Sequence, residues 1–233
     1  MNRNAARVTQ RPSRIALALL LSLCVPLAFA QGRDIDKVNG SITADAGQAY
    51  GDLSTVNGSI RIEDGARTGD AETVNGSIRI GDNARTGGLE TVNGSIRAES
   101  TLQADGDIET VNGSVFVGRG SKLGGVSTVN GAIGLVDSDL SGGIETVSGD
   151  ITVGAGSHVR GGIKVEKPTS NWMPIQMGDR KPPRVVIGPN AVVDGPLVFE
   201  REVALYVHQT ARTGRITGAT AVRYSGDRAP AGE

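Results

Sequence analysis

Cysteine, histidine and aromatic residues are all scarce in this chain of 233 residues, which has one cysteine, two histidines and 3% aromatics. A single thiol cannot close an intramolecular disulfide, so backbone pairing and packing alone must hold the fold. His158 and His208 stand in different parts of the chain, and no Ser, Cys or carboxylate residue recurs near either at a sequence spacing that is typical of a catalytic site. The His-Glu-x-x-His, Gly-x-Ser-x-Gly and P-loop motifs are also absent. We therefore expect no catalytic residue, no cofactor and no metal site.

Residues 1–30 have the features of a secretory signal peptide. Four arginines precede an apolar stretch, residues 15–23, that is too short to span a bilayer, and Ala28-Phe29-Ala30 forms a small-x-small cleavage site. The alternatives are an uncleaved anchor helix and a lipoprotein centred on Cys24, although Leu23 stands where a lipoprotein would have a small residue. We expect an exported protein, periplasmic or secreted to the cell surface, with no membrane span after cleavage.

Cleavage would also change the charge of the chain. Residues 1–30 contain four arginines and no acidic residue, so their removal moves the formal net charge from -1 to -5. No basic run elsewhere reverses this acidic balance. A nucleic-acid partner is therefore not expected.

Glycine is abundant, at 34 residues, and a five-residue motif recurs with it. Val-Asn-Gly-Ser-Ile begins at Val38 and returns, intact or slightly altered, at intervals of 18, 18, 18, 19, 18 and 18 residues. Its leading residues are Val38, Val56, Val74, Val92, Val111, Val129 and Val147. A fixed period this short indicates an array of identical units that must stack to bury a core.

The apolar positions inside each unit indicate strands. We count the leading valine of each unit as position zero. Apolar or small residues then occupy every second position: the valine, the glycine at plus two, and apolar residues at plus four and plus six. This period of two predicts a strand with one buried face. A second apolar row lies three residues before each valine and breaks this alternation, so the chain must bend between the two rows. A third, smaller row comprises Ala66, Ala84, Leu102 and approximately Leu123 and Leu140. Three inward rows imply a coil with three short faces.

These patterns predict an all-β fold, a parallel β-helix (β-solenoid) of about nine to ten coils with an 18-residue period, right-handed and three-faced. A meander of β-hairpins is the structural alternative, because Asn-Gly is a strong hairpin signal. A hairpin array should repeat in pairs of strands, however, whereas one Asn-Gly corner recurs in every 18 residues.

In a parallel solenoid the asparagines of the motif would form a column. Asparagine accepts a left-handed backbone at a corner, and each amide can donate to the amide above, which would satisfy a group otherwise buried unpaired. We expect a structural column rather than metal or sugar ligands, comprising Asn39, Asn57, Asn75, Asn93, Asn112 and Asn130.

Charged residues recur at other fixed positions. Two rows, one of Glu72, Glu90, Glu109 and Glu145 and one of Arg61, Arg79 and Arg97, are expected to be solvated outer faces that oppose aggregation. A calcium site at Asp64, Asp70 and Asp82, near glycine turns, is the alternative to the absence of metal, but the Gly-Gly-x-Gly-x-Asp signature is missing.

The repeat stops after the first part of the chain and then resumes. We expect solenoid repeats over residues 31–166, a Pro-rich loop over 167–184, solenoid coils and a cap over 185–226, and a loose tail over 227–233. The loop holds an apolar cluster that includes Trp172, Met173 and Met177, which would either cover a side of the solenoid or bind a partner. Residues 211–214 repeat Ala-Arg-Thr-Gly from residues 66–69 word for word, so we expect the later coils to continue the same solenoid.

The repeated Val-Asn-Gly-Ser-Ile motif, over about residues 35–165, resembles the adhesin family of exported bacterial β-solenoids, a domain of unknown function. Residues 185–195, Val-Val-Ile-Gly-Pro-Asn-Ala-Val-Val-Asp-Gly, are similar to the turn of bactofilins, which are polymer-forming bacterial proteins with a right-handed β-helix. The resemblance implies a solenoid fold and, more weakly, self-association. It does not imply an activity.

Two classes of function remain open. The first is a non-enzymatic structural or adhesion module of the cell envelope, whose partners would be envelope components or, through end-to-end assembly, the chain itself. The second is a β-helix carbohydrate-active enzyme with a site beside the loop of residues 167–184. A cleft there that brings Asp179, Arg180 and Arg184 together would favour the enzyme.

Overall fold

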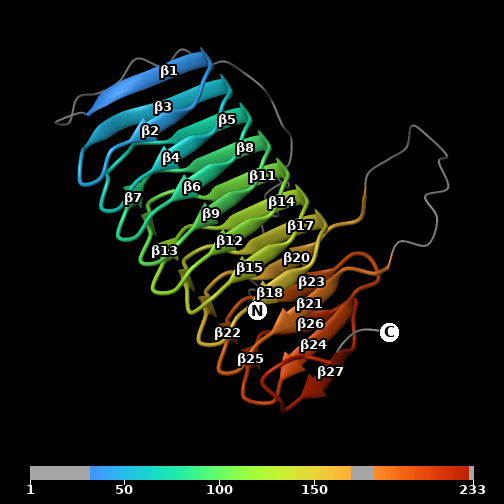
Figure 1. Ribbon diagram of the computed structural model, residues 1–233. Coiled ribbons are helices and arrows are strands. Elements are labelled where there is room, and N and C mark those ends of the chain that lie inside the picture. The colour runs from blue at the N-terminus through green and yellow to red at the C-terminus, as the bar shows by residue number, and fades with distance from the viewer. Residues whose placement is uncertain (1–31, 169–180, 231–233) are drawn as a thin grey trace, which may run out of the picture. The chain divides into compact units, whose positions relative to one another are not determined.

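The computed structural model describes residues 32–168 and 181–230, and every regular element in them is a strand (Figure 1). The strands form three sheets, in each of which neighbouring strands run parallel. Sheet A contains β1 (Arg33–Asn39), β3 (Tyr50–Asn57), β5 (Ala71–Asn75), β8 (Leu89–Asn93), β11 (Ile108–Asn112), β14 (Val126–Asn130), β17 (Ile144–Ser148), β20 (Ile163–Val165), β23 (Leu197–Phe199) and β26 (Ile216–Thr217).

Sheet B receives the chain after the Asn-Gly corner. It contains β2 (Ile42–Ala44), β4 (Ile60–Ile62), β6 (Ile78–Ile80), β9 (Ile96–Ala98), β12 (Val115–Val117), β15 (Ile133–Leu135), β18 (Ile151–Val153), β21 (Arg184–Ile187), β24 (Ala204–His208) and β27 (Ala221–Tyr224). Sheet C completes the coil with β7 (Arg85–Thr86), β10 (Gln103–Ala104), β13 (Lys122–Leu123), β16 (Asp139–Leu140), β19 (His158–Val159), β22 (Val192–Val193) and β25 (Arg212–Thr213).

Equivalent residues of successive repeats lie directly beside one another. Asn57 pairs with Asn39 on one side and Asn75 on the other, and Ile60 pairs in the same way with the isoleucines of its row. The structure is therefore a parallel β-solenoid of about ten coils, as the 18-residue period predicts, and not a hairpin meander. Its handedness stays a prediction.

Burial shows that the leading valine of each motif was assigned to the wrong side. Val38 and Val56 are 68% and 40% exposed, and the later valines of the row are only partly buried. From Val56 to Val147, the threonine just before the valine is buried instead, together with the apolar residue two positions further back, whereas Lys37 precedes Val38. Inward and outward residues thus alternate regularly along each sheet A strand. The bend comes after the valine, at Asn-Gly-Ser. Which residues of the next strand face inward therefore cannot be found by counting from the valine.

The third face has two inward positions rather than one. Leu123 and Leu140 share the row of Thr86 and Ala104, whereas Ala84 and Leu102 lie two residues earlier, just before β7 and β10. The expected third row therefore combined two neighbouring rows. Buried serines continue the earlier row in later coils, and these are Ser121, Ser138 and Ser157.

The coils on the two sides of residues 169–180 belong to the same three sheets. Strand β21 pairs with β18, and β23 pairs with β20. Arg212, of the Ala-Arg-Thr-Gly copy at residues 211–214, lies in the sheet C row that also holds Arg85 of the copy at residues 84–87. Near the last strand, Tyr224 is 8% exposed, packs edge-on against His208 with ring centroids 5.0 Å apart, and donates its hydroxyl to the Ile187 carbonyl. No helix long and apolar enough to cross a membrane occurs in residues 32–168 or 181–230.

Candidate functional site

The corner between sheets A and B carries the asparagine column, and the structure brings all six side chains together. From Asn57 to Asn130, each amide nitrogen donates to the amide oxygen of the asparagine in the preceding coil, over distances of 3.0 to 3.1 Å. The column ends where Ser148 takes the asparagine position, and the Arg201 guanidinium donates to the Ser148 hydroxyl. The column lies at the surface, since all six side chains are exposed, which differs from the expectation that its amides are buried.

The asparagine backbone is not left-handed, contrary to expectation, because none of the six has a positive φ. The close approach falls on the glycine that follows. A Cβ at Gly94 would overlap the carbonyl oxygen of Gly76 in the coil below, and the same holds for the other motif glycines from Gly58 to Gly149. Glycine is therefore needed here so that successive backbones can approach closely at the corner.

Threonine and serine complete the corner from its two sides. The buried Thr91 hydroxyl donates to the Gly76 carbonyl at 2.9 Å, and Thr55, Thr73, Thr110 and Thr128 make the same contact in their coils. The motif serines accept a backbone N–H from the next coil at 3.2 to 3.3 Å. The threonine was not among the residues predicted from the sequence, although it precedes every valine of the row from Val56 to Val147. The polar groups of this corner are thus largely used between coils.

Two further columns are made of aspartates. In one, the carboxylate of Asp52 accepts the backbone N–H of Asp70 at 2.9 Å; in the other, Asp64 accepts that of Asp82 at the same distance. Asp70 therefore belongs to a different column from Asp64 and Asp82, and the three do not converge as a calcium site would require. Within the described residues, no group of three or more His, Cys, Asp or Glu side chains is arranged to hold a metal ion.

The outer face of sheet A concentrates carboxylates. Glu72 and Glu90 pair in register, and Glu109 follows in the next coil. The pKa of Glu72 is raised above its usual value, first by burial and then by the nearby charges of Glu90, Asp70 and Asp52. The pKa of Glu145 is raised as well, by burial and by Glu166, while Lys164 opposes the shift. This face therefore carries negative charge that nearby cations only partly offset.

Trp172, Met173 and Met177, the candidate binding residues, lie outside the described residues, as do Asp179 and Arg180. Arg184, the third residue whose convergence with these two would favour the enzyme, is engaged with the C-terminal segment. Its guanidinium donates to the carbonyls of Ala229 and Pro230 at 3.3 and 3.0 Å and lies 5.1 Å from the centre of the Tyr206 ring. Its backbone N–H donates to the carboxylate of Asp150. These contacts give Arg184 a role in packing.

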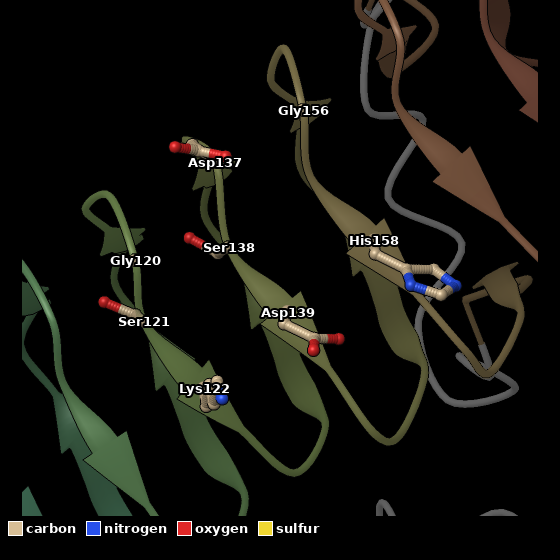
Figure 2. A pocket seen from close by; sticks show the side chains of 8 residues that line it. All are labelled: Gly120, Ser121, Lys122, Asp137, Ser138, Asp139, Gly156 and His158. Carbon is tan, nitrogen blue, oxygen red and sulfur yellow. The ribbon is translucent and has the colours of Figure 1, made fainter.

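Sheet C has a shallow hollow of about 220 Å³ near Lys122, Asp139 and His158 (Figure 2). Asp139 is held by Arg160 at 2.8 Å, and His158 is held at 2.7 Å by Asp194 of the next coil. The imidazole points away from Asp139 in Figure 2.

Serine hydroxyls line the same hollow but are already engaged. Ser121 and Ser138 both donate to the Gly118 carbonyl, at 2.7 and 3.1 Å. In the part of the chain that the structure describes, no serine hydroxyl is hydrogen-bonded to His158. Among the described residues, Asp139 and His158 of the hollow are thus engaged by Arg160 and Asp194, and no nucleophile is paired with a base there.

Comparisons with protein-family models, with curated proteins and with solved structures find no match to this chain.

Proposed function

We propose that the chain is a non-enzymatic, exported structural or adhesion-type β-solenoid of the bacterial cell envelope that acts by surface binding or self-association. The observation that carries the proposal is the repetition of residue types along two outer rows over consecutive coils. Sheet A presents Glu72, Glu90 and Glu109 on three consecutive coils, and sheet B presents Arg61, Arg79 and Arg97 on three, before other residues such as Ser127 and Phe116 take these positions. Regular faces of this kind offer an extended contact surface, whereas an active site needs convergent groups of different chemistry.

The remaining support comes from the sequence. Residues 1–30 read as a signal peptide, and the repeated motif resembles that of exported adhesin-family solenoids, with a bactofilin-like turn at residues 185–195. No described contact favours the carbohydrate-active enzyme, because Arg184 is committed to the C-terminal segment.

Fractionation of bacteria that express the full chain tests the export step. We expect the product outside the cytoplasm with Gln31 as its first residue. A cytoplasmic product that keeps residues 1–30 would contradict export.

Binding to the envelope is tested by sedimenting the purified, labelled protein with isolated envelope fragments. We expect saturable binding that an excess of unlabelled protein displaces. Sedimentation that shows neither saturation nor displacement would count against a binding role.

A further inference from the structure

The outer face of sheet A is negatively charged over much of its length. From β3 to β17, the sheet A strands contain no Lys or Arg. Their outward row holds Glu72, Glu90 and Glu109 on three consecutive coils. The raised pKa of Glu72, caused by burial and by neighbouring carboxylates, agrees with a crowded negative strip.

The outer face of sheet B carries the opposite charge at the same spacing. Arg61, Arg79 and Arg97 pair in register on β4, β6 and β9, and these three strands contain no acidic residue. Arg61 and Arg97 contact exposed glutamates two residues along, at 3.7 and 3.1 Å. Exposed pairs of this kind are weak, and Arg79 has glycine at the corresponding position. Arg97 also lies 4.5 Å from the centre of the Phe116 ring. Arg61 and Arg79 are therefore the arginines best placed to bind another partner.

The two rows match in pitch because both are built on consecutive coils of one solenoid, about 4.8 Å apart. They lie in different sheets of the same coils, so one molecule cannot pair them with each other across its own core. A second copy, lying alongside, can place Arg61 and Arg79 against Glu72 and Glu90, one to one.

Partly exposed valines lie beside the glutamates on sheet A and strengthen the match. Val74, Val92 and Val111 are two residues further along the same strands and face outward with the glutamates. Arginine side chains bury their methylene stems on apolar surface while the guanidinium reaches a carboxylate. This outer face of sheet A therefore fits an arginine side chain better than a small cation, which has no apolar stem to pack on the valines.

We propose that two copies of this chain associate side by side, with the glutamate row of sheet A in one copy docked on the arginine row of sheet B in the other. This inference deepens the proposed function by naming a partner and a surface. The interface is heterologous, because each contact uses the acidic row of one copy and the basic row of the other, so association continues to higher order.

Sedimentation velocity of the purified protein tests the inference with two complementary variants. The acidic-face variant is Glu72→Lys with Glu90→Lys, and the basic-face variant is Arg61→Glu with Arg79→Glu. Each variant has like charges on both faces, so we expect each alone to associate at least about tenfold more weakly than the wild type. An equimolar mixture pairs the opposite charges again and should recover association.

Two controls separate face pairing from misfolding and from net charge. Arg85→Glu with Lys122→Glu, on sheet C, makes the same charge change as the basic-face variant and should associate like the wild type. Thermal unfolding of every variant shows that its fold is intact. Raising the salt concentration should weaken wild-type association, because exposed charge pairs are screened.

Two results would overturn the inference: a wild-type protein that stays monomeric at every concentration in low salt, or folded variants whose mixture stays monomeric. A monomeric chain that still binds envelope fragments saturably would remove the lateral contact and leave the proposed function standing.

Discussion

The buried threonine column offers two substitutions with the same chemistry and opposite expected signs. Thr91 is 1% exposed and donates its hydroxyl to the Gly76 carbonyl at 2.9 Å. Thr146 occupies the same position three coils later and is fully buried, but its hydroxyl has no hydrogen-bond partner among the described residues. Replacement by valine keeps the shape of the side chain and removes only the hydroxyl.

The expected magnitudes follow from the net value of one hydrogen bond. Thr91→Val loses that bond and leaves the carbonyl without its donor, which should destabilise the fold by about 1 to 2 kcal/mol. Thr146→Val removes a buried unpaired group and should stabilise it by about 1 to 2 kcal/mol. The two variants should therefore differ by about 1 M in their urea unfolding midpoints. Equal shifts, or a destabilised Thr146→Val variant, would refute the reasoning.

Three further predictions concern the corner and the acidic face. In the asparagine column, Asn75→Ala loses two side-chain hydrogen bonds and Asn39→Ala loses one. Urea unfolding should therefore show that Asn75→Ala lowers the free energy of unfolding by roughly 1 kcal/mol, about twice the decrease caused by Asn39→Ala. Gly94→Ala places a Cβ against the Gly76 backbone of the preceding coil and should lower the free energy of unfolding by about 2 kcal/mol or more. At Gly134 a Cβ would meet only ordinary van der Waals contact, so Gly134→Ala should be neutral or stabilise its strand by about 0.5 kcal/mol. Thermal unfolding measures both effects. The pKa of Glu72 is raised in the fold by burial and then by nearby carboxylates, so its ionised form destabilises the fold at neutral pH. Glu72→Gln should therefore stabilise the protein at pH 7. Urea unfolding should show that this gain vanishes below about pH 4, where the carboxyl is protonated in both the folded and the unfolded state.

Each of these predictions has a clear opposing result. Equal effects at the end and the middle of the asparagine column would mean that the ladder does not contribute to stability. A harmless alanine at position 94 would mean that the corner backbones are further apart than described. A stabilisation by Glu72→Gln that persists unchanged at low pH would point to packing instead of charge.

The period of the motif predicts the solenoid, because stacking coils of equal length brings identical residues of successive repeats beside one another. The pairing of Asn57 with Asn39 and Asn75 follows directly from that period. The inward side was harder to predict. Valine is apolar and fits strands, but Val56 lies on the outer face and Thr55 points inward to bind a carbonyl.

The local reason for that error is the corner. Alternation holds within a strand, but Asn-Gly-Ser interrupts it, so residues on the two sides of the corner do not share one count. Ser121 in sheet C is a similar case, since its hydroxyl is buried because it binds the Gly118 carbonyl. A pattern of apolar residues cannot predict that such polar side chains are buried, because their hydrogen bonds to the backbone leave no apolar residue in the sequence.

The stacking of like residues on like is tested most directly by distances between spin labels on the outward row of sheet A. Register pairing places Ser54 and Ser127 four coils apart and Asp36 and Ser127 five coils apart. At about 4.8 Å per coil, the backbone separations should be about 19 and 24 Å. Two distances in that range, differing by about one coil, are the predicted result. Equal distances, or separations that differ by many coils, would contradict the parallel stack and the functional proposals that depend on its regular faces.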